Sequence, residues 1–469
     1  MKPKILYGAV ATVVVVAATA VLGAGQSSSP AHESGGNDVL SCSPAPCVLS
    51  PTQVSFGVDA LDAPIAVDPS NPARITVGAD YPQCSPQSGL AFYVTNDGGS
   101  DWSTFCMVPF FSGQQEYIPD GDPVLAYDRN SVAYIGGFYV NDNGRTSSGF
   151  EGFQKSSDGV TWSDPEIAVI RPNYDPSYCW MAIDDGPASP YANSIYISCV
   201  MVGPLNNRTN NQVVVAHSTD GGATWNQVNV APIQEYPDND FYPTLAIGKG
   251  GTVYVTWMYC NMGPQACNNE KGYMVFSRSA DGGNTWSQPT PVAQVMLTTY
   301  LPNTSIVIRD GPAISVDNSS GPHAENLYVS MYNWTGTLMQ VQVVRSTDGG
   351  TTWSKPVPVA PGETHDQFLP WISVSPTGLV GVSWLDRRND PNNINYQAFG
   401  AISADGGLSF QPNVPLTIAF SNPNAGAVNF MIGNYTGNTW DGPDYFLAAW
   451  MDDSQTMYMQ DFVGGIRLK

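Results

Sequence analysis

The chain has 469 residues, of which 40 are acidic and 18 basic, so its formal net charge is −22 although only 12% of its residues are charged. An acidic chain without a basic footprint argues against nucleic acid as a partner. The length exceeds what one ordinary hydrophobic core usually holds, unless the fold is a closed ring of repeated units.

The first 25 residues read as a targeting segment. Lys2 and Lys4 precede an uncharged stretch, Ile5–Gly25, that is rich in Val and Ala. Its length fits both a cleaved signal peptide and an N-terminal membrane anchor, the only membrane contact that we expect. Residues 26–50 follow as a low-complexity linker rich in Ser, Pro and Gly, and residues 51–469 are expected to form one domain. Either kind of leader would place this domain outside the cytoplasm, secreted or attached to the cell surface.

The eight cysteines fall into neighbouring pairs along the chain. Their spacings do not resemble a zinc site, and the chain has only four histidines. In an exported protein this pattern usually indicates disulfides. We therefore expect four local bridges, which are Cys42–Cys47, Cys84–Cys106, Cys179–Cys199 and Cys260–Cys267.

Six copies of one short turn sequence punctuate the rest of the chain at intervals of roughly 60 residues, which is typical of a repeat protein. STDGGTTW, at Ser346–Trp353, is a representative copy, whereas the last copy ends in Phe410 instead of Trp. The Asp carboxylate can accept hydrogen bonds from backbone N–H groups ahead of it, and the Gly pair permits positive φ. The aspartates, which we expect to hold the turns, are Asp97, Asp158, Asp220, Asp281, Asp348 and Asp405.

Between these turns a second pattern recurs. A short apolar strand, which often begins at proline, is followed by a turn and a second apolar strand that ends in aromatic residues. Helical periodicity is absent. The first strands begin at Pro64, Pro123, Trp180, Pro243, Pro312 and Pro370.

A seventh unit follows the last turn. Its three strands are expected at Asn429–Tyr435, Tyr445–Met451 and Met457–Phe462, and no sequence remains downstream for a fourth. The segment Gln53–Val58 can supply that strand, which would close the ring without an open edge. About 420 residues divided by the repeat length give about seven units, with six as the alternative.

The run of turns resembles the Asp-box, or BNR repeat, of the sialidase superfamily of β-propellers. Pro370–Val374 followed by Trp384–Pro391 also resembles a motif of secreted sialidase-like Asp-box proteins. This resemblance implies an all-β propeller with four antiparallel strands in each blade. It implies a shape, and an activity has to be argued from the site.

In a propeller, the loops that enter first strands and leave second strands share one rim, so their side chains are expected to converge on one mouth. Many of the residues at these positions are acidic. Clustered carboxylates of this kind perturb one another's pKa values, as a glycosidase requires, or hold Ca²⁺ through their oxygens. No cofactor is required, but the spacing of two pairs suits Ca²⁺: Asp120 with Asp122, and Asp238 with Asp240.

The resemblance to sialidases also implies roles for individual residues, although the Arg-Ile-Pro that carries a sialidase's first arginine is missing here. Guanidinium groups suit the carboxylate of an anionic sugar. For substrate binding we expect Arg309, Arg387, Arg388, Trp371 and Trp384. For catalysis we expect Asp366 or Asp386 as acid/base and Tyr435 as nucleophile with Glu235 beside it.

The leading hypothesis is therefore an exported propeller that acts on extracellular glycans or glycoproteins, with exo-sialidase-type hydrolysis as its most specific form. The alternative is a non-catalytic propeller that binds carbohydrate or protein at the cell surface. A polysaccharide lyase on the same scaffold is a third hypothesis.

Overall fold

The computed structural model describes residues 42–80, 84, 86–141, 149–207, 209–261, 267–308, 311–410, 412–426 and 430–469. The chain divides into Met1–Gly36 and Asn37–Lys469, and the second unit contains all of the described residues. The expected leader, residues 1–25, lies outside them. Within the described ranges every named element is a strand, and we find no helix long and apolar enough to span a membrane.

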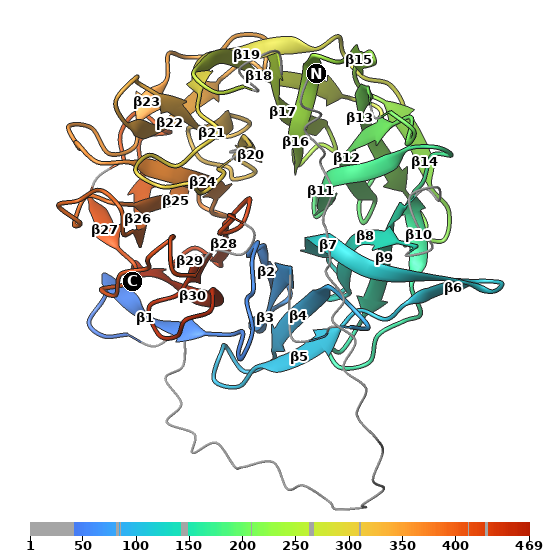
Figure 1. The fold of residues 1–469 in the computed structure, drawn as a ribbon, viewed down its shortest axis with the longest axis horizontal. Helices are drawn as coiled ribbons and strands as arrows, with labels where there is room; N and C mark the ends of the chain where they lie inside the picture. Colours follow the sequence, from blue (N-terminus) through green and yellow to red (C-terminus); the bar gives the residue numbers. More distant parts are fainter. Residues whose placement is uncertain are drawn as a thin grey trace, which may run out of the picture. The chain divides into compact units, whose positions relative to one another are not determined.

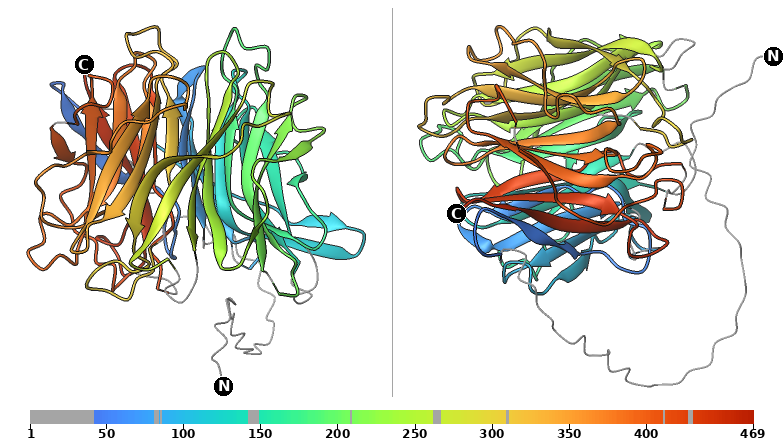
Figure 2. Two further views of the ribbon diagram at one scale, coloured as in Figure 1. Left: turned by 90° about the horizontal axis from the view of Figure 1, so that it is seen from above. Right: turned by 90° about the vertical axis from the view of Figure 1, so that its left-hand side faces the viewer.

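Seven antiparallel sheets stand around a common axis, which confirms the all-β propeller and selects seven blades over six (Figure 1). Their strands run between the two faces of the ring (Figure 2). Blade 1 consists of β2 (Ile65–Asp68), β3 (Asn71–Asp80), β4 (Leu90–Thr95) and β5 (Ser103–Cys106). Blade 2 consists of β7 (Gln115–Tyr127), β8 (Ala133–Val140), β9 (Phe150–Ser156) and β10 (Glu166–Val169), with β6 (Phe110–Ser112) on the other side of β7.

The next four blades follow in chain order. Blade 3 consists of β11 (Asp175–Ile183), β12 (Ile195–Gly203), β13 (Asn210–Ser218) and β14 (Asn226–Asn229), and β15 (Gln234–Glu235) also pairs with β13. Blade 4 consists of β16 (Asp238–Ile247), β17 (Val253–Asn261), β18 (Glu270–Ser279) and β19 (Thr290–Leu297). Blade 5 consists of β20 (Ala313–Val316), β21 (Leu327–Trp334), β22 (Met339–Ser346) and β23 (Val357–Pro358). Blade 6 consists of β24 (Gln367–Val374), β25 (Val380–Asp386), β26 (Gln397–Ser403) and β27 (Asn413–Pro415).

Blade 7 combines both ends of the chain. It consists of β28 (Gly437–Asp441), β29 (Tyr445–Asp452), β30 (Gln460–Arg467) and the N-terminal β1 (Cys47–Gln53). The first strand of every blade is the innermost (Figure 1), and each first strand contacts the first strands of both neighbouring blades. The residues at the start of these strands are therefore brought to one end of the axis.

The ring is closed by an N-terminal strand, as expected, but the segment differs. β1 pairs with β30 from Cys47 opposite Arg467 to Gln53 opposite Phe462, so the expectation of Gln53–Val58 was wrong. The sheet also extends into the segment that we expected to be linker. Pro51 lies in a bulged stretch of β1, and an outer edge strand tolerates a proline because its outward N–H positions need no partner.

The prediction for the first strand of blade 7 was also wrong. Asn429–Tyr435 was expected, whereas β28 begins at Gly437. The backbone N–H groups of Asn434 and Tyr435 are donated to the carboxylate of Asp62 instead of a neighbouring strand, and Phe430 is exposed. The apolar residues of this segment therefore mimic a strand that does not form.

The repeated turns join the third strand to the fourth in blades 1 to 6. In blade 5 the Ser346 hydroxyl donates to Asp348 Oδ1 at 2.8 Å and accepts the Gly350 N–H at 2.9 Å. The Asp348 carboxylate also accepts the hydroxyl and the N–H of Thr352, and these bonds lower its pKa to about 2. Gly350 has φ of 85°, and a Cβ there would meet the ring of Phe276 in blade 4 at 2.2 Å. Glycine is thus required twice at this position, by the turn and by the neighbouring blade.

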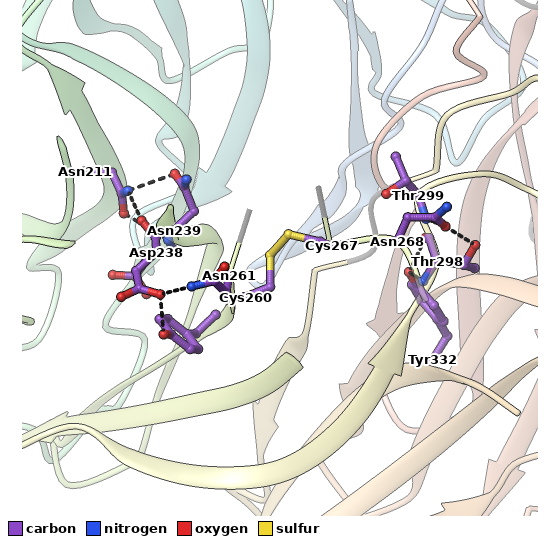
Figure 3. Close-up of a disulfide and its surroundings, with 12 residues drawn as sticks. Asn211, Asp238, Asn239, Cys260, Asn261, Cys267, Asn268, Thr298, Thr299 and Tyr332 are labelled. Atoms are coloured by element: carbon purple, nitrogen blue, oxygen red, sulfur yellow. Dashed lines mark hydrogen bonds between the residues drawn. A yellow bond between two sulfur atoms is a disulfide. The ribbon is translucent and has the colours of Figure 1, made fainter. Parts of the chain in front are cut away.

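All four expected disulfides are present, each between residues of one blade or its flanks. Cys260–Cys267 links the end of β17 to the residues that lead into β18 in blade 4 (Figure 3). Since disulfides persist in oxidising compartments, this framework supports an extracytoplasmic location.

Replacement of the turn serine tests the contribution of these turns to stability. Ser346→Ala removes two hydrogen bonds of a buried hydroxyl, so we expect the free energy of unfolding to fall by about 1–2 kcal/mol. Urea unfolding followed by tryptophan fluorescence measures it. The control is Ser320→Ala at an exposed site, which should change stability by less than about 0.5 kcal/mol. Equal losses in both variants would contradict the role of the turn.

Candidate functional site

Five of the first strands have a strained residue, which lies within the strand or shortly before it. Asp62, Asp122, Tyr178, Tyr242 and Leu369 have φ between 47° and 59°, a region that non-glycine residues rarely occupy. The register shifts at the corresponding places in blades 2, 3, 4 and 6, so these strands contain β-bulges. Bulges re-aim side chains and are frequent beside functional sites. We call these five residues and their immediate neighbours on the same rim the mouth.

Aromatic side chains fill the axis below the mouth. The rings of Trp180 in blade 3 and Trp371 in blade 6 lie 4.4 Å apart, and Tyr435 meets Trp180 edge-on at 5.6 Å. These residues, with Tyr178 and Tyr242, line a cavity of about 20 Å³, which is room for one water molecule. This cavity is therefore too small to hold a sugar ring.

Asp62 is fully buried where blade 1 meets blade 7. Its carboxylate accepts the N–H groups of Asn434 and Tyr435, which favours the ionised form. Burial nevertheless raises its pKa to about 7, and the negative charge of Asp122 contributes to the rise. At neutral pH this carboxyl is thus poised between its two protonation states.

Asp122 is the partly exposed carboxyl of the mouth. Its Oδ2 accepts the Tyr178 N–H of blade 3 at 2.9 Å. Burial and the charge of Asp120 raise the pKa of Asp122, and that hydrogen bond opposes the rise. Asp120 lies two residues earlier and is exposed. The pair consequently combines a carboxyl that tends to hold its proton with an exposed neighbour.

Glu151 on β9 was missed by the sequence analysis. It is fully buried, and neither carboxylate oxygen has a hydrogen-bond partner in the described part of the chain. Burial, with the charge of Asp122, raises its pKa well above the usual value. A sequence signal existed, because the residue five positions before the turn hydroxyl is apolar in the other five copies. Those residues are Leu90, Val213, Met274, Val341 and Ala398.

Tyr435 and Glu235 do not form the expected couple. Tyr435 donates its hydroxyl to the Pro123 carbonyl at 2.8 Å, and its pKa is raised well above the usual value by burial and then by Asp62. Asp122, Asp80 and Glu151 add to the rise. Glu235 instead is exposed on β15, at the outer side of blade 3. A buried tyrosine that holds its proton is unsuited to act as a nucleophile.

Arg387 and Asp366 form a buried ion pair, which corrects their expected roles. Arg387 Nη1 lies 3.3 Å from Asp366 Oδ2, and both side chains are 0% exposed. The same nitrogen donates to the Pro302 carbonyl at 2.7 Å, and the guanidinium lies over the ring of Phe368. Burial lowers the pKa of Arg387 to about 10. Neither group can reach a substrate from this position.

Arg388 and Asp386 are also held by structural contacts. Arg388 Nε donates to Asp386 Oδ1 at 2.9 Å, and Nη1 lies 3.0 Å from Glu363. Trp384 is buried and donates its indole N–H to Asp386 as well. These contacts occupy the guanidinium, the carboxylate and the indole that were expected to handle substrate. Arg309, the third expected arginine, lies outside the described residues.

The second candidate metal pair, in blade 4, is engaged in hydrogen bonds (Figure 3). Asp238 accepts the Tyr259 hydroxyl and the Asn261 side chain, each at 2.8 Å. Asp240 accepts the Trp257 indole N–H at 2.9 Å, and burial raises its pKa to about 7. Within the described ranges no group of three or more metal-ligating side chains is gathered for a metal ion. Ca²⁺ binding stays a prediction. Thermal unfolding in the presence of Ca²⁺ and of a chelator tests it.

The fold defines the class of the molecule, a seven-bladed all-β propeller. No protein-family model matches the chain. It is similar to a xyloglucanase of Hypocrea jecorina, with 24% identity over 74% of this chain and 40% of that protein. Xyloglucanase Xgh74A of Acetivibrio thermocellus is 26% identical over 64% of this chain and 32% of that protein. The chain thus spans well under half the length of these curated relatives.

Among solved structures, a PL25 ulvan lyase bound to a glucuronate–sulforhamnose unit has a TM-score of 0.53 at 14% identity. The alignment covers 89% of this chain and 96% of the lyase. The NanB sialidase of Streptococcus pneumoniae has a TM-score of 0.47 at 11% identity, over 72% of this chain and 67% of NanB. At such identities the likeness to the lyase concerns the fold alone.

The raised pKa values predict how stability depends on pH. Asp62 and Asp240 titrate near pH 7 when folded, and Asp441 and Asp453 near pH 6, against 3.8 for the free group. The folded state therefore binds more protons than the unfolded state between about pH 4 and pH 7. We expect the free energy of unfolding to be highest near pH 4 and to fall by a few kcal/mol by pH 8, as measured by urea unfolding.

Asp240→Asn provides the matched control, because asparagine keeps an acceptor for the Trp257 indole while removing the ionisable group. It should make the slope between pH 4 and pH 7 shallower, while Asp62, Asp441 and Asp453 still contribute to it. Stability that rises over this range in the unmodified protein would contradict the raised pKa values.

Proposed function

We propose that this protein is a glycan-acting propeller in which Asp122 transfers protons at the mouth, with Asp120 as its ionised partner. The observation that carries the proposal is the partly exposed Asp122, whose pKa is raised by burial beside an exposed carboxyl. Glycoside hydrolysis requires such a division, in which one carboxylic acid protonates the leaving oxygen and a carboxylate assists on the other side.

The remainder of the mouth suits a sugar chain. Partly exposed aromatic side chains, Tyr178, Trp180 and Trp371, come from blades 3 and 6, which face each other across the axis, and the rings of Trp180 and Trp371 meet there. Aromatic faces with polar edges stack on apolar surfaces while retaining hydrogen bonds, a property that suits the alternating character of a sugar ring. The acidic residues of blades 1 and 2 lie next to them around the ring, so a bound glycan would meet both kinds of group.

Names of similar proteins support a carbohydrate substrate without specifying it. Two are xyloglucanases, and the propeller with the highest structural likeness reported above is an ulvan lyase. The sialidase hypothesis is weaker, since two of its three expected arginines are held in ion pairs. We also propose that the protein works outside the cell, where its four disulfides would persist.

Replacement of Asp122 tests catalysis. With xyloglucan or ulvan as substrate, we expect Asp122→Asn to lower kcat by roughly 10²–10⁴ with little change in KM, because asparagine keeps the acceptor for Tyr178 N–H but has no proton to transfer. Reducing-end release measures hydrolysis, and ultraviolet absorbance of unsaturated ends measures lyase cleavage. A fluorogenic sialoside serves as the test of sialidase activity.

The control is Asp441→Asn at the end of β28, which removes another carboxyl of raised pKa from the opposite rim and should leave kcat unchanged. Full activity of Asp122→Asn would reject the assignment. Binding of a glycan, by calorimetry, with no turnover by the unmodified protein would favour the non-catalytic alternative, which the small axial cavity also allows.

A further inference from the structure

The ring is closed by contacts between distant parts of the chain. We call the contact between blade 7 and the residues that lead into blade 1 the seam, comprising residues 47–62, 433–435 and 460–467. Val54 N–H donates to the Asp461 carbonyl at 2.9 Å, and Asp461 N–H donates to the Ser55 hydroxyl at 2.7 Å. Asp62 accepts the N–H groups of Asn434 and Tyr435 from the other side. All of these bonds join residues more than 370 positions apart.

Two buried carboxyls, those of Asp62 and Asp461, lie in this seam. Asp461 is 0% exposed, and neither of its side-chain oxygens has a hydrogen-bond partner in the described part of the chain. The negative charge of Asp62 raises the pKa of Asp461 further beyond the effect of burial. The groups that face the pair are also acidic or neutral. They are Asp122 and Tyr435 around Asp62, and Ser55 and Tyr93 around Asp461.

The two carboxyls differ in what supports their ionised forms. Asp62 has three N–H donors, two from the backbone and one from the Asn434 amide, which compensate a negative charge. Within the described residues Asp461 has none on its carboxylate, so its charge would stand unpaired in a medium of low polarity. When Asp62 ionises, Asp461 therefore has to keep its proton, and loss of both protons places two like charges inside the seam.

We propose that the seam is a proton-operated clasp: while Asp461 is protonated the two ends of the chain hold the ring closed, and ionisation of both Asp461 and Asp62 in alkaline solution loosens β1 from β30. The loosened state relieves the repulsion by admitting water to the two carboxylates. It also exposes the ladder edge of β30, which closure by β1 covers.

Hydrogen–deuterium exchange of the full chain at pH 5.5 and pH 8.5, corrected for the intrinsic effect of pH, tests the clasp. Peptides from β1 and β30 should open about tenfold more often at the higher pH, as one pKa unit of differential proton binding implies. Peptides from β20 and β21 in blade 5, two strands that contain no acidic residue, should change much less. An equal change in all four strands would reject a local clasp.

Two variants separate the clasp from a general effect of pH. Asp461→Asn removes the ionisable group without changing its size, and it should abolish the increase in β1 and β30. Asp62→Asn should do the same, which keeps the test available if one variant fails to fold. Asp240→Asn, a buried carboxyl of similarly raised pKa in blade 4, should leave the increase intact. Persistence of the increase in Asp461→Asn, or its loss in Asp240→Asn, would overturn the proposal.

Discussion

Closure of the ring without a covalent link is the constraint on which the structure depends. The innermost strands contact one another all round the axis, and the last contact is made by β2 with β28. Each disulfide lies within one blade or its flanks, so none of them holds the ends of the ring together. That task falls to the pairing of β1 with β30 and to the Asp62 carboxylate. Every residue of the mouth owes its position to this closure.

The two rims of the ring use the same side chain in opposite electrostatic states. On the turn rim, Asp220, Asp281 and Asp348 are exposed or nearly so, and short hydrogen bonds lower their pKa values to about 2. On the mouth rim, Asp62 and Asp240 are buried with raised pKa values, because loss of hydration outweighs the hydrogen bonds that they accept. Acid therefore destabilises the turn rim only at low pH, where its carboxylates gain protons. The mouth rim is already destabilised at neutral pH, where its buried carboxyls lose protons.

Local chemistry explains why most of the fold could be predicted. The turns need Ser or Thr, Asp and Gly at fixed spacing, and the Pro-led first strands follow each turn, so the blade count could be read from the sequence. The strands of the last blade could not be predicted in this way, because that blade lacks the repeated turn. In addition, Asn434 and Tyr435 donate their N–H groups to Asp62, 372 or more positions away. A pairing so distant leaves no trace in local pattern.

The site was harder to predict, since sequence reports which groups approach a rim but not which of them are buried. Arg387 and Arg388 stand side by side in the chain, and both were expected at the mouth. Tertiary contacts place Arg387 against Asp366 and Phe368, and Arg388 against Asp386 and Glu363. Rare arginines in a chain of low charge are thus used to neutralise buried or half-buried carboxylates.

Glu151 shows how repetition itself carries functional information. Corresponding positions in the blades have similar surroundings, so the residue at one position can be compared with those at the same position in the other copies. An apolar side chain satisfies this position in five copies, whereas blade 2 buries an unpartnered carboxyl there. A Cβ at Gly136 would lie 3.5 Å from Glu151 Oε1, so a small residue on β8 leaves space for it. Because carboxyls with perturbed pKa values cluster at functional sites, this costly departure beside the charge of Asp122 makes Glu151 a further candidate for the site.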